Sequence, residues 1–207
     1  MNIIELELED CFTVLLRINW LALVISLILA SFVPIVFKRI NNSLNKKSME
    51  IKNFDLGIGN SKIKLSYNKK DQEVAYKLWV ELSTRKIGIP FDEEHDVIVQ
   101  VYDSWYEFFK IAREILKEIP AERIPYSNEL INLSEQVLNE GLRPHLTKWQ
   151  AEFRMWYEKE VKTSQNLSPQ EIQIKYPKID LLITDLKNTN KHMIEYKKLM
   201  GKIAFKK

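Results

Sequence analysis

The longest uninterrupted hydrophobic stretch runs from Ile18 to Phe37 and contains no charged side chain. At about 1.5 Å per residue, a helix of this length covers the roughly 30 Å hydrocarbon core of a bilayer. A helix also satisfies its own backbone hydrogen bonds, which the interior of a bilayer requires. Because the apolar pattern extends upstream with Arg17 as its one interruption, we expect residues 12–37 to form a transmembrane helix.

The charges on the two sides of this stretch differ in sign. Residues 1–11 are acidic and contain no Lys or Arg, which argues against a cleaved signal peptide, whose first region is basic. Residues 38–52 are rich in basic side chains, among them Lys38, Arg39, Lys46 and Lys47. The positive-inside rule therefore places the N-terminus outside and the rest of the chain in the cytoplasm. We predict that these basic residues form a juxtamembrane linker held at anionic headgroups.

Small and polar residues recur at helical spacing within the hydrophobic stretch. Asn19, Ala22, Ser26 and Ala30 share one side of the predicted helix. Such a stripe lets two helices approach closely, so we predict self-association, with chance as the alternative because Ala and Ser are common in apolar segments. Arg17 either extends to the headgroups or joins Asn19 at the mouth of a pore lined by several copies.

Beyond the linker, the hydrophobic spacing indicates a β-hairpin followed by helices. Residues 53–67 alternate apolar and polar positions around a turn at Gly59, as a hairpin requires. Residues 68–200 carry apolar positions every three or four residues, which predicts a cytosolic helical domain. Residues 201–207 form a tail that is expected to fray. The predicted fold class is mainly α, with one N-terminal transmembrane helix, a short hairpin and a bundle-like helical domain.

Sequence signals divide the helical domain into segments. The first predicted helix covers residues 70–86, and the acidic motif at residues 91–96 is expected to open the second. A third helix starts at Ser127 and pauses at Gly141–Pro144. Near the C-terminus, Ser168 and Glu171 form a capping box with Pro at the first helical position, which predicts a helix or helix pair reaching about Met200.

Composition excludes several classes of protein. The chain has 207 residues, a formal net charge of +3, 45% hydrophobic residues and a single cysteine. It is therefore neither a disordered chain nor a disulfide or cysteine-rich zinc scaffold. The three histidines lie on separate segments without metal-binding spacing, and no glycine-rich phosphate loop is present. We predict no metal, no cofactor and no catalytic residue; the acidic motif at 91–96 suits a helix start better than a cation.

The segment from Arg143 to Lys159 alternates aromatic and cationic residues, which is typical either of a surface that binds bases and phosphates or of a helix facing the core. The candidates for binding a partner or ligand are Arg143, His145, Lys148, Trp149, Arg154 and Trp156. Arg143 and His145 also suggest the acid–base pair of RNA-cleaving helical domains. Such domains usually place four to six residues between the two, so a structural or capping role for His145 is the stronger interpretation.

In layout, with one spanning helix before a small cytosolic helical domain that includes the stretch GLRPHLTKWQAEFRMWYEKE, the chain resembles the small membrane effectors of bacterial antiphage defence operons. The resemblance implies an oligomer in the bacterial inner membrane. It also implies a trigger, either a regulatory protein or a nucleotide or nucleic-acid signal, after which the membrane is compromised. The resemblance assigns no catalytic residue.

Three functions of different class follow from these observations. The first is a self-associating, non-enzymatic membrane effector that forms a pore or disrupts the bilayer under control of its cytosolic sensor domain. The second is a membrane-tethered adaptor that docks a protein or nucleic-acid partner. The third is a membrane-anchored nuclease. The sequence favours them in that order.

Overall fold

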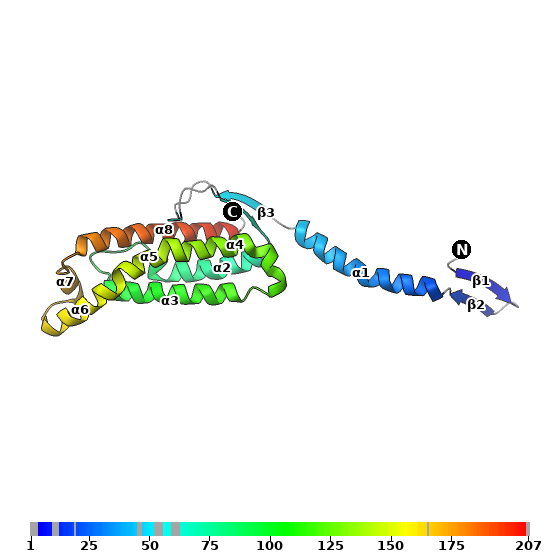
Figure 1. Cartoon of the computed structure of the whole chain (residues 1–207), viewed down its shortest axis with the longest axis horizontal. Helices are drawn as coiled ribbons and strands as arrows, with labels where there is room; N and C mark the ends of the chain where they lie inside the picture. Colours follow the sequence, from blue (N-terminus) through cyan, green and yellow to red (C-terminus); the bar gives the residue numbers. More distant parts are fainter. Residues whose placement is uncertain are drawn as a thin grey trace. The chain divides into compact units, whose positions relative to one another are not determined.

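The computed structural model describes the backbone of residues 4–9, 13–18, 20–44, 47–51, 56–58, 63–164 and 166–205. It describes the side chains of residues 23–38, 56–58, 66–164 and 166–205. The chain divides into two compact units, Met1–Lys46 and Lys47–Lys207. The described residues are mainly helical, as the hydrophobic pattern predicted (Figure 1).

The first unit contains a strand pair and one helix. Strand β1 (Ile4–Glu9) pairs antiparallel with β2 (Thr13–Ile18), and helix α1 extends over Trp20–Leu44. The helix predicted over residues 12–37 is therefore wrong in both bounds. The alternation of apolar and acidic residues in β1 and the β-branched residues of β2 favour a strand pair before the helix. At its other end, α1 continues to Leu44, into residues 38–52 that the sequence analysis assigned to a linker.

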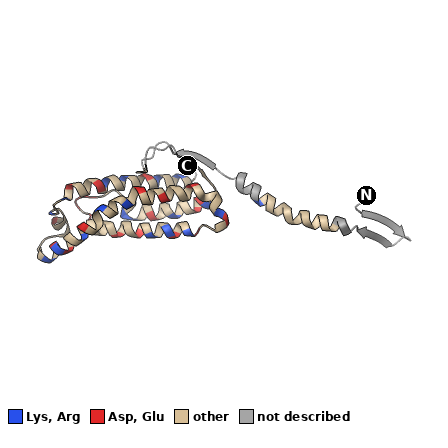
Figure 2. Ribbon diagram, viewed as in Figure 1, with Lys and Arg blue, Asp and Glu red and all other residues tan. Residues whose placement is uncertain are grey.

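Over residues 23–37, helix α1 presents uncharged and mostly apolar side chains on all sides. Its large hydrophobic side chains from Leu23 to Phe37 are 41–70% exposed. Figure 2 shows no charged residue in this part of the helix, whereas basic and acidic residues are interspersed over the helices of the second unit. Among the residues that the structure describes, no helix combines the length and the hydropathy needed to cross a membrane.

The second unit contains helices α2 to α8. Of these, α2, α3, α4 and α8 lie side by side as a bundle (Figure 1). The bounds are α2 Lys69–Thr84, α3 Ile98–Lys117, α4 Ile124–Gln136, α5 Arg143–His145, α6 Ala151–Thr163, α7 Pro169–Gln173 and α8 Ile179–Phe205. Short 3-10 turns lie at Lys86–Gly88 and Ala121–Arg123.

Side-chain caps account for several helix starts. Asn68 and Asp71 form a capping box at α2, and the predicted box of Ser168 and Glu171 is present at α7. The acidic motif does not open α3, contrary to expectation. Asp92 instead accepts hydrogen bonds from the backbone N–H groups of Glu94 and His95 in a turn, and α3 begins at Ile98.

Residues 201–205 of the predicted tail are helical rather than frayed. Helix α8 continues to Phe205, and Ile203 is fully buried. The Phe205 ring meets the Trp79 ring of α2 edge-on at 4.9 Å between centroids. The sequence analysis ended the domain at Met200, but packing of α8 along α2 stabilises another turn and a half.

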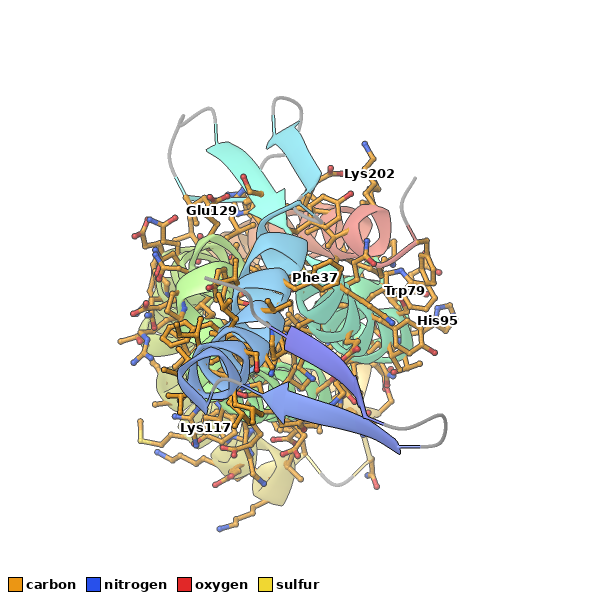
Figure 3. The ribbon with its side chains drawn as sticks, turned by 90° about the vertical axis from the view of Figure 1, so that its right-hand side faces the viewer. Phe37, Trp79, His95, Lys117, Glu129 and Lys202 are labelled. Atoms are coloured by element: carbon orange, nitrogen blue, oxygen red, sulfur yellow. The ribbon has the colours of Figure 1, made fainter. Side chains whose placement is uncertain are left out.

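The β-hairpin of the second unit uses a different first strand from the one predicted. Strand β4 (Ile63–Tyr67) pairs antiparallel with β3 (Lys47–Ile51), which falls in the predicted linker. Leu56, assigned to the first strand by its apolar pattern, is instead buried in the helical core beside a bend at Gly57. The Ser66 backbone N–H of β4 donates to the Glu129 carboxylate of α4, which Figure 3 shows beside the strands.

Candidate functional site around Asp185

Four side chains from three parts of the bundle form a hydrogen-bonded group, which we call the Asp185 cluster: Tyr102, His145, Trp149 and Asp185. The His145 Nδ1 atom lies 2.9 Å from Asp185 Oδ2, and the Trp149 indole N–H donates to the same oxygen at 2.7 Å. The Tyr102 hydroxyl lies 3.2 Å from His145 Nε2. Helix α3 supplies Tyr102 and helix α8 supplies Asp185, so the cluster joins two helices to the segment between α4 and α6.

The electrostatics of the cluster favour a neutral histidine and an ionised aspartate. Burial lowers the pKa of His145 below its usual value, and this outweighs the hydrogen bond and charge of Asp185. Partial burial works to raise the pKa of Asp185, but hydrogen bonds from His145 and Trp149 hold it below its usual value. Burial raises the pKa of Tyr102. A neutral imidazole that donates from Nδ1 to Asp185 and accepts from Tyr102 at Nε2 satisfies this geometry.

The chain between α4 and α6, residues 137–150, follows an unusual helical path through this site. The sequence analysis predicted a pause at Gly141–Pro144, but the chain stays helical, with π-helical turns at Val137–Leu142 and Leu146–Gln150 on either side of α5. In an α-helix, the Pro144 ring would collide with the carbonyl group four residues earlier. The wider π turns accommodate Pro144, and His145 between them is buried. Such turns recur at functional sites.

Glycines allow an irregular segment to approach this helical path. Gly57 has φ of 69°, and a Cβ atom there would lie 2.5 Å from His192 Nδ1. At Gly141, a Cβ atom would lie 2.9 Å from the Leu56 carbonyl oxygen. The described residues 56–58 therefore close over the bundle next to the Asp185 cluster.

A polar cavity of about 310 Å³ lies beside the cluster. Its lining includes Glu140, His145, Lys148, Asp185, Asn188 and His192. A neighbouring cavity of about 660 Å³ shares Lys148 and Asp185 and adds Lys187 and Lys191. Lys187 is paired with Glu93, and Lys148 lies 4.6 Å from the centre of the Trp149 ring. Asp185, whose side chain is 36% exposed, therefore presents its charge to both cavities, and lysine side chains line the larger one.

The arrangement suits binding of a polar ligand more than acid–base chemistry at His145. Both ring nitrogens of His145 are engaged, and its side chain is 1% exposed. Within the described part of the chain, no group of three or more His, Cys, Asp or Glu side chains is placed to hold a metal ion. Polar contacts from Asp185, Lys148 and Asn188 remain as the means of holding a ligand.

The candidates from the Arg143–Lys159 segment are divided between opposite faces. His145 and Lys148 line the polar cavity, whereas Arg143 and Arg154 line a separate, mostly apolar cavity of about 490 Å³. The nuclease interpretation requires Arg143 and His145 to meet at one site, but the structure places them at different cavities. The aromatic stripe faces inward: Trp149 is 4% exposed, and Trp156 packs at 5.1 Å from the Tyr176 ring.

The candidates near the N-terminus belong to the first unit. Ser26 and Ala30 lie in α1, and the Ser26 hydroxyl donates to the Leu23 carbonyl at 2.9 Å. Lys38 is exposed on α1. The remaining side chains of the proposed stripe, pore mouth and basic surface lie outside the described ones: Arg17, Asn19, Ala22, Arg39, Lys46 and Lys47.

Sequence reasoning missed Tyr102, Asp185 and His192. Tyr102 and Asp185 lie within predicted helical segments, and no motif connects them with His145. Only the packing of α3 and α8 against the helical path brings them together. No family model matches the chain, and no curated protein and no solved structure was found to be similar to it.

Proposed function

We propose that the protein is a single-pass, self-associating membrane effector whose helical unit is its cytosolic sensor. The observation that carries this proposal is the run of exposed, uncharged apolar side chains on α1 from Leu23 to Phe37. Burying apolar surface stabilises a chain by about 25 cal/mol per Å². A continuous exposed apolar surface of this kind marks a site that contacts lipid or protein.

The lipid bilayer is the environment that accommodates α1 best. The hydrophobic run from Ile18 to Phe37 is long enough to cover the hydrocarbon core, and Lys38 follows it directly. A soluble partner would cover one face of a helix, but the described side chains of α1 are exposed all round. The acidic start and the basic flank support a cytoplasmic position for the second unit, at the bacterial inner membrane.

Self-association through α1 is the second part of the proposal. Ser26 and Ala30 are small and lie one turn apart, in line with Ala22 and Asn19 of the sequence pattern. The Ser26 hydroxyl donates a hydrogen bond to the Leu23 carbonyl of the same helix. Ser26 therefore brings neither a bulky side chain nor an unpaired hydroxyl to a contact between helices. Assembled copies would place Arg17 and Asn19 at the outer mouth of a pore.

The second unit supplies the sensor in this proposal. It buries its own core, in which Leu78, Trp105, Phe108, Leu186 and Met193 are fully covered. Its polar and apolar cavities have the volumes of ligand-binding sites. A regulatory protein or a nucleotide signal bound there would control the assembly of α1.

Membrane association tests the proposal first. The full chain is expected in the membrane fraction and to resist extraction by alkaline carbonate. A variant with Leu27→Arg and Phe32→Arg should shift to the soluble fraction, because each arginine at mid-membrane depth costs about 2.5–3.5 kcal/mol. The matched control, Leu181→Arg with Met155→Arg, alters exposed apolar residues of the second unit and should stay in the membrane. Wild-type chain in the soluble fraction without detergent would refute the proposal.

A membrane-tethered adaptor is the second candidate, favoured by the same two ligand-sized cavities. Liposomes carrying a trapped fluorophore separate the two functions. Reconstituted chain that releases the fluorophore above a threshold concentration behaves as an effector. Chain that inserts without release, while its second unit still binds a partner, behaves as an adaptor.

A further inference from the structure

The apolar cavity on the other side of the helical path, which we call the Arg143 cavity, has the composition of a site for a small ligand. It lies between α3 and the path from Arg143 to Arg154 and has a volume of about 490 Å³. Phe109, Leu146 and the exposed Tyr106 ring supply apolar and aromatic surface, and Thr147 and Gln150 supply hydrogen-bonding groups. Ligand sites in proteins combine a largely apolar lining with a few polar groups in this way.

Arg143 provides a cation that no carboxylate among the described residues neutralises. Its Nε–H donates to the Asn139 side-chain oxygen at 3.1 Å, and its guanidinium group lies 5.0 Å from the centre of the Phe109 ring. Both contacts hold the guanidinium group in place without cancelling its charge. Arg113 lies 5.6 Å from the centre of the same ring and adds positive charge at this end.

The other end of the cavity is electrically balanced. There Arg154 is paired with Asp103 at 2.6 Å. The positive potential is therefore concentrated near Phe109, whereas the surface between the two ends is apolar. A ligand that matches this distribution carries its negative charge at one end and a flat apolar body next to it.

We propose that the Arg143 cavity binds a small aromatic anion, a planar ring that bears a phosphate or carboxylate group. The anion pairs with Arg143, whose planar fork suits either group. The ring packs against Tyr106 and Leu146. This inference deepens the sensor role proposed for the second unit, since it names the chemical class of the signal.

Equilibrium dialysis with the full chain in lipid nanodiscs tests the inference. The probes are AMP, GMP and indole-3-acetate, with adenosine and inorganic phosphate as partial ligands. At least one aromatic anion is expected to bind tenfold or more tightly than both partial ligands. AMP or GMP as the tighter probe would indicate a nucleotide source, and indole-3-acetate an aromatic carboxylate.

Matched variants locate the bound probe. Arg143→Gln should weaken binding by about 10- to 100-fold, the usual effect of losing a charged hydrogen bond. Lys148→Gln, which alters a cation of the same segment that lines the other cavities, should change binding less than twofold. Tyr106→Ser should weaken binding of the aromatic anions and leave phosphate unaffected.

The inference fails if no aromatic anion exceeds the partial ligands, or if Arg143→Gln leaves binding unchanged. If no probe binds and Arg143→Gln changes the mass of the oligomer, the cavity is a contact between copies of the chain. That result also overturns the inference. Neither result bears on the proposal that α1 spans the membrane, because fractionation of α1 variants tests that proposal separately.

Discussion

His145 Nδ1 and Asp185 Oδ2 lie 2.9 Å apart, and this pair connects helix α8 to the π-helical path around Pro144. The His145 side chain is almost completely buried, whereas the Asp185 side chain is partly exposed and lines the two neighbouring cavities. The hydrogen bond therefore joins a buried imidazole to a carboxylate that is partly exposed.

Asp185→Asn should destabilise the second unit by about 1–3 kcal/mol, because an amide replaces an ionised acceptor of two buried donors. The measurement is the free energy of unfolding by urea, followed through the tryptophan fluorescence. Asp103→Asn is the matched control. It breaks an ion pair whose Asp103 side chain is 60% exposed, and such pairs contribute about 0–1 kcal/mol. Equal losses in both variants would contradict a stabilising role for the cluster.

Stability should decrease as the pH falls from about 7.5 to 5. The pKa of His145 is lowered in the folded state relative to about 6.5 in the unfolded chain, so the unfolded chain binds the extra proton first. The stabilisation is complete above the unfolded pKa and is lost as the pH falls through it towards the folded pKa. The expected slope is at most about 1.4 kcal/mol per pH unit.

Variants assign this pH dependence to one residue. The groups that face His145 are Asp185 of α8, Tyr102 of α3 and Lys148 of its own path. Because hydrogen bonds from His145 and Trp149 hold the pKa of Asp185 below its usual value, Asp185 stays ionised across the measured range. His145→Asn should remove the slope, whereas His95→Asn, at an exposed histidine, should keep it. A slope that persists in His145→Asn would rule out the assignment.

Gly57→Ala should destabilise the second unit by about 1–3 kcal/mol, since φ of 69° is costly for alanine and its Cβ atom would meet His192. Thermal unfolding of the single variant is compared with Gly57→Ala in a His192→Ala background. In the His192→Ala background, the destabilisation by Gly57→Ala should be smaller by about 1 kcal/mol or more, because the clash is gone and only the backbone strain remains. The same cost in both backgrounds would show that His192 does not restrict this position.

Ser26→Ile should reduce self-association of α1, because a larger side chain separates helices that meet along the small stripe. Ser31→Ile is a close control: its hydroxyl donates to the Ile28 carbonyl at 2.7 Å, just as Ser26 donates to Leu23, but it lies off the stripe. Analytical ultracentrifugation of detergent-solubilised chain should give a lower mass for Ser26→Ile than for Ser31→Ile. A monomeric wild-type chain would end the pore interpretation.

The sequence by itself determined the mainly helical class, the apolar character of α1 and the capping box at Ser168, since each of these depends on neighbouring residues. Periodicity and capping are local properties that a single segment carries. The sequence also marked the segment around Pro144 as unusual, although it indicated a pause rather than π-helical turns.

Only the tertiary structure decided how distant residues combine. It extended α8 to Phe205 because the Trp79 ring lies beside it, and it chose β3 over residues near Leu56 because Leu56 is buried in the helical core. It joined His145 to Asp185 and separated His145 from Arg143, although these last two are neighbours in the sequence. Burial and long-range hydrogen bonds depend on which helices pack together, and no local pattern contains that information.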